Sequence, residues 1–131
     1  MTLEFEVSEW FAAAPEAVYA AWLDSAGHTA MTGSPAQVSA MVGGTFSAWE
    51  GYISGHFIVL EPCRRILQAW RTSEFAAADP DSQLEVLLEA RDGGTQMTLH
   101  HSNLPAHGET YLQGWLDFYF APMKAYFQRS G

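Results

Sequence analysis

The sequence predicts an α+β fold in which a curved antiparallel sheet of about six or seven strands wraps around a long C-terminal helix, with one or two short helices after the first strand. Two observations lead to this prediction. Residues 107–129 repeat apolar side chains at helical spacing, which is the strongest periodic signal in the chain. Residues 36–99 instead show short strand-like segments separated by turns containing glycine and proline. A wide aromatic helix face needs a large concave partner, and these strands provide one.

The composition indicates one globular domain over residues 1–131 and argues against two classes of partner. The chain is 48% hydrophobic and 16% charged, as expected for a folded sequence. Its formal net charge is −9, and none of its six Lys and Arg residues precedes Arg64. Phosphate groups are bound by clustered basic residues. We therefore expect no binding to nucleic acid or to an anionic membrane.

No targeting or membrane-spanning segment is expected. The segment from Met1 is polar and alternating, so we expect no signal peptide and no membrane span. The single Cys63 excludes an internal disulfide framework, and a reducing cytoplasm is the simplest location for such a chain.

The first elements follow from alternation and from proline placement. Residues 3–11 alternate apolar and polar side chains, which predicts a half-buried strand. Pro15 favours the first turn of a helix, where its missing N–H costs no hydrogen bond. Residues 26–32 fit a second short helix less clearly, and Gly-Ser-Pro at 33–35 ends it.

Six further strands are predicted before the final helix. They cover residues 37–41, 45–50, 52–60, 65–73, 84–90 and 96–101. Asp-Gly-Gly at 92–94 is a hairpin turn signal, and residues 76–81 fit a loose loop. The final helix would be about 35 Å long. Pro122 lies within it and cannot donate to the carbonyl of Phe118, so we expect a kink there.

The order of elements and several short segments resemble a known superfamily. Residues 15–22 (PEAVYAAW) resemble the first helix of the START-like or SRPBCC superfamily, the birch-pollen-allergen fold often called helix-grip. A subgroup of it, the homologues of the activator of heat-shock-protein-90 ATPase, is similar in six segments. These are 43–46 (GGTF), 51–55 (GYISG), 60–71 (LEPCRRILQAWR), 94–105 (GTQMTLHHSNLP), 114–115 (GW) and 121–123 (APM).

The resemblance implies a helix-grip fold with an apolar cavity between the sheet and the C-terminal helix. The superfamily includes lipid and hormone binders and polyketide cyclases. The resemblance therefore implies the fold and does not point to one particular activity. The eukaryotic co-chaperone of the subgroup carries an additional N-terminal domain that contacts its client ATPase. We expect no such domain within these 131 residues.

Eight residues are the candidates for lining such a cavity: Trp22, Phe46, Phe57, Gln68, Trp70, His101, Trp115 and Tyr119. The Trp and Tyr rings offer apolar walls with polar edges. Gln68 and His101 would orient a ligand, because inward polar groups need hydrogen-bond partners. Ordinary core packing is the alternative for each of the eight.

His101 is the most informative polar residue. By alternation it faces inward with Met97 and Leu99, where it would either meet a ligand as an acid, base or orienting group, or simply bond a buried neighbour. His100 faces the opposite way, so the two cannot clamp one metal ion. The remaining histidines have no partner at metal-ligand spacing. We therefore predict no metal and no cofactor.

Trp49 poses a question of parity. If Phe46 points inward, Trp49 points outward beside Tyr52, which would suggest a dimer or partner surface. A bulge near Gly51 would turn Trp49 inward instead.

Three functional hypotheses follow. The first is binding of a small hydrophobic ligand in the cavity. The second is an enzyme of the cyclase or hydrolase kind that uses His101. It is less favoured, because no nucleophile with a base and no pair of carboxylates stands out. The third is a protein-interaction or co-chaperone-like module, a monomer or a homodimer, with a dimer forming through the sheet surface near Trp49.

Overall fold

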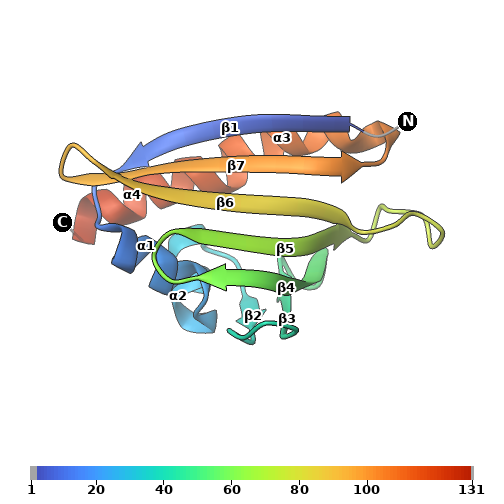
Figure 1. The fold of residues 1–131 in the computed structure, drawn as a ribbon, viewed down its shortest axis with the longest axis horizontal. Coiled ribbons are helices and arrows are strands. Elements are labelled where there is room, and N and C mark those ends of the chain that lie inside the picture. Colours follow the sequence, from blue (N-terminus) through green and yellow to red (C-terminus); the bar gives the residue numbers. More distant parts are fainter. Residues whose placement is uncertain (1–2, 131) are drawn as a thin grey trace.

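The computed structural model describes residues 3–130 and the side chains of residues 3–128, and it confirms the predicted α+β architecture (Figure 1). Seven antiparallel strands form one sheet in the order β1-β7-β6-β5-β4-β3-β2. The strands are β1 Leu3–Phe11, β2 Ala36–Val38, β3 Thr45–Ala48, β4 Ile53–Glu61, β5 Arg65–Thr72, β6 Ser82–Arg91 and β7 Gly94–Leu104. Because β2 to β7 pair in sequence order, most of the sheet is built from hairpins, and β1 joins it beside β7.

The register of the sheet explains the alternation seen in the sequence. In the β6–β7 hairpin Val86 lies opposite Leu99 and Leu88 lies opposite Met97. All four side chains are buried on the inner face. A single-residue slip would move this whole set to solvent, so apolar burial fixes the pairing.

Strand β2 is shorter than predicted and ends at Val38. One more backbone bond to β3 follows, from the Ser39 N–H to the Thr45 carbonyl at 2.9 Å, and the chain then pairs with Phe57 of β4. The Gly43 N–H donates to the Phe57 carbonyl at 2.8 Å, and the Phe57 N–H donates to Gly44 at 2.9 Å. The edge strand is also held from the other side, where the Ser25 hydroxyl accepts from the Val38 N–H at 2.8 Å.

Two short helices, α1 Pro15–Trp22 and α2 Ser25–Thr32, follow β1, so the second helix suggested by the sequence is present. The Asp24 carboxylate accepts a hydrogen bond from the Gly27 N–H at 2.8 Å and caps the start of α2. Gly33 ends α2 in the left-handed region at φ 83°, a conformation that glycine adopts without steric cost.

The C-terminal helix differs from the prediction at Pro122. A 3₁₀ turn η1 (Ala106–Glu109) precedes α3 (Thr110–Gly114), a π-helical segment η2 (Trp115–Phe120) and α4 (Ala121–Ser130). In the π-helical segment the Ala121 N–H donates to Leu116, five residues back. The structure thus places a wider turn just before Pro122, where a kink was predicted, and this turn accommodates the missing N–H.

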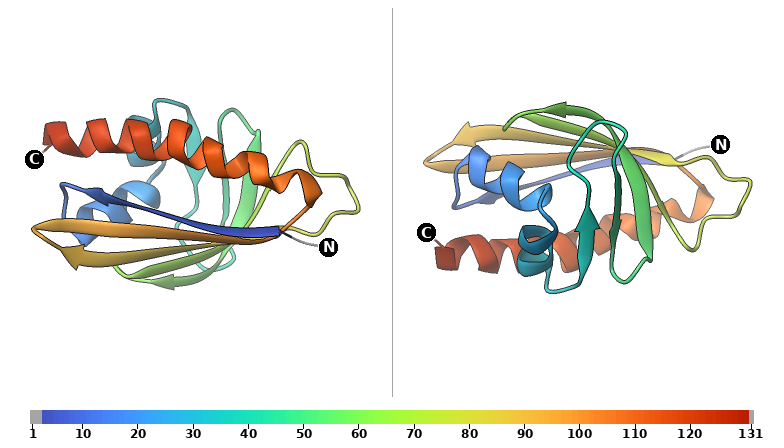
Figure 2. Two further views of the ribbon diagram at one scale, coloured as in Figure 1. Left: turned by 90° about the horizontal axis from the view of Figure 1, so that it is seen from above. Right: turned by 90° about the horizontal axis from the view of Figure 1, so that it is seen from below.

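The helices lie on one face of the sheet (Figure 2). The C-terminal helix crosses the concave face, while α1 and α2 cover the end near the β6–β7 turn (Figures 1 and 2). Buried aromatic and aliphatic side chains from both layers form one cluster between them. No helix in residues 3–130 combines the length and the apolar character needed to cross a membrane.

Candidate functional site

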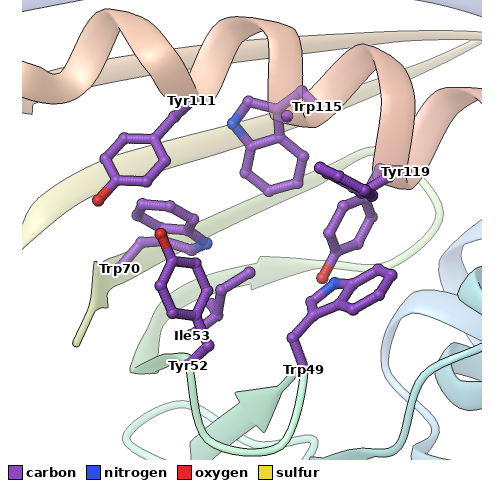
Figure 3. A pocket seen from close by; sticks show the side chains of 9 residues that line it. Trp49, Tyr52, Ile53, Trp70, Tyr111, Trp115 and Tyr119 are labelled. Atoms are coloured by element: carbon purple, nitrogen blue, oxygen red, sulfur yellow. The ribbon is translucent and has the colours of Figure 1, made fainter. Parts of the chain in front are cut away.

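A pocket of about 330 Å³ lies between the C-terminal helix and the turn that joins β3 to β4 (Figure 3). It is open on one side, and its surface is almost entirely apolar. Seven of its nine lining residues are aromatic, and the other two are Ile53 and Gly114. The aromatic residues are Trp49, Tyr52, Trp70, Tyr111, Trp115, Phe118 and Tyr119.

The helical wall of the pocket depends on residue spacing along α3 and η2. Tyr111, Trp115, Phe118 and Tyr119 recur at intervals of three or four residues and so face the same side. Gly114 lies between them in helical conformation, and a Cβ added there would meet only the Phe118 ring, at 4.0 Å. The absent side chain of Gly114 therefore leaves part of the pocket unfilled.

The opposite wall comes from an unusual turn after β3. Trp49, Glu50 and Gly51 are all in the left-handed region, with φ of 56°, 58° and 86°. This turn ends the strand before the predicted residue 50 and directs the Trp49 ring toward the helix. Its centroid lies 5.7 Å from that of Phe118 and 6.4 Å from that of Tyr119. Trp49 thus lines the pocket, so of the two orientations left open by the sequence, the inward one is found.

A chain of hydrogen bonds connects the Tyr119 hydroxyl through His28 to the Trp22 backbone. The Trp22 carbonyl accepts from His28 Nδ1 at 3.0 Å, so His28 Nε2 is free to accept from the Tyr119 hydroxyl at 3.1 Å. Burial lowers the pKa of His28 and raises the pKa of Tyr119, while a hydrogen bond with Trp49 opposes the latter shift. Both groups are therefore neutral at pH 7, and the Tyr119 ring is fixed in place.

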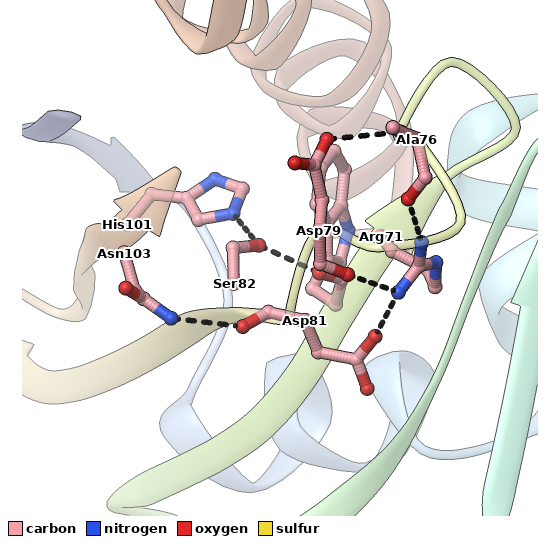
Figure 4. A network of polar contacts seen from close by, with 8 residues as sticks. Arg71, Ala76, Asp79, Asp81, Ser82, His101 and Asn103 are labelled. Atoms are coloured by element: carbon pink, nitrogen blue, oxygen red, sulfur yellow. Dashed lines mark hydrogen bonds and ion pairs between the residues drawn. The ribbon is translucent and has the colours of Figure 1, made fainter. Parts of the chain in front are cut away.

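His101 belongs to a second chain of hydrogen bonds and does not line the pocket. Its side chain is 0% exposed. The Trp115 indole N–H donates to Nδ1 at 3.1 Å, so Nε2 carries the proton and donates to the Ser82 hydroxyl at 2.8 Å. Ser82 in turn donates to the Trp70 carbonyl at 2.6 Å (Figure 4). Burial lowers the pKa of His101 to about 3. Both ring nitrogens are occupied, so the predicted ligand-orienting or acid–base role is replaced by support of Trp115.

The structure places three of the eight predicted residues, Trp70, Trp115 and Tyr119, on the pocket wall. Four others lie deeper: Trp22, Phe46, Phe57 and Gln68 surround a gap of only about 10 Å³. This volume is at the lower limit for one water molecule. Gln68 does not reach the pocket, because its side-chain carbonyl accepts from the Trp22 indole at 3.0 Å. These four residues are core, and they support the wall rather than form it.

Sequence reasoning missed most of the pocket rim. Tyr111, Gly114 and Phe118 lie within one helical turn of Trp115, and that spacing was the signal available in the sequence. Tyr52 and Ile53 follow the Trp49 turn, whose left-handed backbone has no clear sequence signal apart from Gly51.

The loop between β5 and β6, expected to be loose, is tied to Arg71 (Figure 4). The guanidinium pairs with Asp81 at 2.8 Å and donates to the carbonyls of Asp79 and Ala76 at 3.1 and 3.0 Å. It also lies 5.3 Å from the centroid of the Phe75 ring. The loop is thereby held beside the Tyr111 side of the pocket, since Phe75 lies 6.1 Å from the Tyr111 ring.

The pocket lining is apolar and uncharged. The nine lining residues carry no charged side chain, and their polar atoms are phenol hydroxyls and indole N–H groups. Among residues 3–130 no group of three or more His, Cys, Asp or Glu side chains is arranged to hold a metal ion.

A curved sheet that encloses its C-terminal helix, with an apolar pocket between the two, defines a helix-grip protein. The chain belongs more narrowly to the family described as Activator of Hsp90 ATPase homolog 1-like protein, whose family model matches residues 12–128. The resemblance seen in the sequence is thus confirmed.

Named relatives agree with this assignment. The chain is 28% identical over 127 residues to the human Activator of 90 kDa heat shock protein ATPase homolog 1, covering 96% of this chain and 37% of the human one. An uncharacterised protein from Schizosaccharomyces pombe is also 28% identical over 127 residues, covering 96% of this chain and 38% of its own. The chain therefore spans less than two fifths of the length of these curated relatives.

A solved structure supports the same fold. The crystal structure of an Hsp90 activator from Plasmodium falciparum is 26% identical, covers 94% of this chain and 94% of its own, and gives a TM-score of 0.86.

Proposed function

We propose that this protein binds a small molecule with a flat apolar body in the aromatic pocket. The observation that carries the proposal is the lining itself, in which seven rings surround about 330 Å³ of space open to solvent on one side. This volume is near the lower end of the range for small-molecule sites. It suits a molecule of one or two fused rings.

The hydrogen-bond chains behind the wall favour this function. The Trp115 N–H is directed to His101 and the Tyr119 hydroxyl to His28, so both groups are already paired with residues that do not line the pocket. A ligand would meet mainly ring faces and edges, which are held in place before it arrives. Apolar burial would supply most of the affinity, about 25 cal/mol per Å² before ordering costs.

Phe118 offers a clean test, because its side chain is 58% exposed at the pocket mouth. Indole is a suitable two-ring probe, and its dissociation constant can be measured by NMR titration. We expect Phe118→Ala to weaken indole binding several-fold while changing the free energy of unfolding by less than about 0.5 kcal/mol. Leu87→Ala is the matched control, since Leu87 is a partly exposed apolar residue outside the pocket. Absence of indole binding to the unmodified protein would overturn the proposal.

Trp115→Ala should weaken binding further, at a larger structural cost. Trp115 is only 3% exposed, and removing such a ring typically costs about 3–5 kcal/mol of stability. The variant should therefore be marginally folded, and its binding is to be compared only at a temperature where it remains native.

Native mass spectrometry of the unmodified protein purified from its own host would show whether a natural ligand copurifies.

A second candidate function is contact with another protein. It is favoured by the human relative, named an activator of 90 kDa heat shock protein ATPase, and by the exposure of Phe118, Met41 and Val42 at 58%, 62% and 65%. The test is the ATPase rate of a purified 90 kDa heat shock protein with and without this chain. An increase that Phe118→Ala or Met41→Ala reduces would support this function. An unchanged rate together with no measurable association would contradict it.

A further inference from the structure

One side of the pocket differs from the rest in carrying hydroxyl groups. Tyr52 and Tyr111 face each other there, and Figure 3 shows both hydroxyls away from the Trp49 and Tyr119 side. The Tyr52 hydroxyl donates to the Glu74 carboxylate at 2.7 Å. The Tyr111 hydroxyl lies 2.6 Å from the Thr72 hydroxyl and 3.1 Å from His107 Nε2.

The charge near this side is negative. Glu74 is exposed, and its carboxylate is bonded to the hydroxyl of Tyr52, whose side chain lines the pocket. Arg71 is the cation nearest to Glu74 along the chain, but its charge is paired with Asp81 at 2.8 Å, and its guanidinium lies 5.3 Å from the centroid of the Phe75 ring. No Lys or Arg is among the nine described residues that line the pocket. The chain as a whole carries a net charge of −9.

Aromatic rings attract cations through their negative faces, and a hydrogen bond to a carboxylate makes a phenol ring more electron-rich. Seven rings around one space, a carboxylate bonded to the hydroxyl of one of them and no cation in the lining together form a surface complementary to a positive charge. An anion would meet the same surface with no counter-charge and with its hydration removed.

We propose, building on the proposed ligand-binding function, that the ligand of this pocket is an organic cation, an aromatic or aliphatic body bearing an ammonium or quaternary ammonium group. The cationic group lies between the Tyr52 and Tyr111 rings, toward Glu74, and the apolar body lies against Trp70 and Trp115.

Three probes of similar size and different charge separate this inference from simple apolar binding. They are phenyltrimethylammonium, its neutral isostere tert-butylbenzene, and benzenesulfonate. Their dissociation constants for the full chain are to be measured by NMR titration at low and at physiological ionic strength. We expect the cation to bind about tenfold more tightly than the neutral isostere. We also expect its affinity to fall as salt is added, and we expect no binding of the anion.

Two variants locate the charge preference. Glu74→Gln removes the carboxylate charge but keeps an oxygen that can accept from Tyr52, so it should weaken binding of the cation about three- to tenfold and leave the neutral isostere unchanged. Glu6→Gln makes the same change of charge on the exposed face of β1, far from the pocket, and should leave both affinities unchanged.

The outcomes distinguish the two proposals. If the neutral isostere binds as tightly as the cation or more tightly, the cation inference is overturned while the proposed function stands. The cation inference is likewise overturned if Glu74→Gln leaves the preference for the cation intact. If none of the three probes binds, both proposals fail.

Discussion

At the scale of single residues, two adjacent histidines of β7 illustrate how strand parity assigns different roles. His100 faces outward, where Nε2 lies 2.7 Å from the Glu4 carboxylate. His101 faces inward and connects Trp115 to Ser82 through its two ring nitrogens. Surface ion pairs contribute little to stability, whereas an unmatched buried polar group is costly. The two positions should therefore respond differently to the same substitution.

His101→Leu should lower the free energy of unfolding by about 2–4 kcal/mol, because it leaves the buried Trp115 N–H without an acceptor and removes the hydrogen bond that Ser82 accepts. His100→Leu, the matched control one residue away, should change it by less than about 0.5 kcal/mol. Urea unfolding of the wild type and the two variants at pH 7.5 measures both changes in the free energy of unfolding. Equal effects of the two substitutions would contradict the role assigned to His101.

The pKa of His101, lowered from 6.5 to about 3, also predicts a pH dependence. Below pH 6.5 the unfolded chain binds a proton at His101 that the folded protein does not bind until about pH 3. The stabilising contribution is therefore complete above pH 6.5 and is lost as the pH falls through this window, by up to about 1.4 kcal/mol per pH unit. His28, whose pKa is also lowered by burial, should act in the same direction.

Measurement of unfolding at several pH values between 7.5 and 4.5 checks this linkage. The wild type should lose stability more steeply than His101→Leu, because the variant lacks the titrating group and all other groups are shared. Parallel curves for the two proteins would show that His101 does not titrate as its burial requires.

Residue roles were only partly accessible from the sequence. Alternation along β7 correctly placed His101 on the inner face, but alternation cannot say which part of that face borders the pocket. Trp49 was undecidable for a related reason. Its orientation depends on the left-handed backbone at residues 49–51, and only the last of these is a glycine.

At the scale of elements, the C-terminal helix combines two features that oppose stability, a glycine at position 114 and a π-helical segment after it. Gly114 has φ −59° and ψ −42°, so any residue would fit its backbone. Glycine in a helix is destabilising relative to alanine by about 0.5–1 kcal/mol. A residue that weakens the helix while leaving pocket space open is consistent with a binding role.

Gly114→Ala should therefore have effects of opposite sign on stability and on binding. The free energy of unfolding should rise by about 0.5–1 kcal/mol, and indole affinity should fall several-fold because the methyl group occupies pocket space. Gly33→Ala is the matched control, since its φ of 83° disfavours alanine and it lies outside the pocket. That variant should lose stability and keep its affinity. A Gly114→Ala protein that binds indole as before would argue against the pocket as the site.

The elements themselves were predictable where the apolar period was long. The strands of the β6–β7 hairpin and the C-terminal helix matched their expected positions, because burial imposes a regular pattern over many residues. The π-helical segment was not predictable. Over six residues a π-helix and an α-helix place apolar side chains on nearly the same face, so Pro122 signalled only that some adjustment was needed.

At the scale of the whole molecule, the 15 acidic residues outnumber the six Lys and Arg residues, which gives the formal net charge of −9. All five Lys and Arg residues whose side chains the structure describes form ion pairs with acidic neighbours: Arg64, Arg65, Arg71, Arg91 and Lys124. Most of the remaining acidic groups repel one another across the surface. Such repulsion disfavours the compact state and is screened by salt.

Sodium chloride should therefore stabilise the protein. Raising its concentration from about 20 to about 300 mM should increase the free energy of unfolding by about 1 kcal/mol, because screening shortens the range of the repulsion. Glu6→Lys, which makes the net charge two units less negative, should show a smaller increase. Stability that falls with added sodium chloride would mean that the ion pairs outweigh the repulsion.

The close approach of the tryptophan rings has an optical consequence. The Trp70 and Trp115 ring centroids are 5.7 Å apart with their planes at 41°, and the Trp22 ring lies 6.3 Å from Trp115. Electronic transitions of indoles held this close in a chiral arrangement couple, and they give a split band in near-ultraviolet circular dichroism. Near-ultraviolet signals of this kind vanish when fixed packing is lost. The pocket wall thus carries its own chromophore, which reports whether the geometry of the site is intact without any added label.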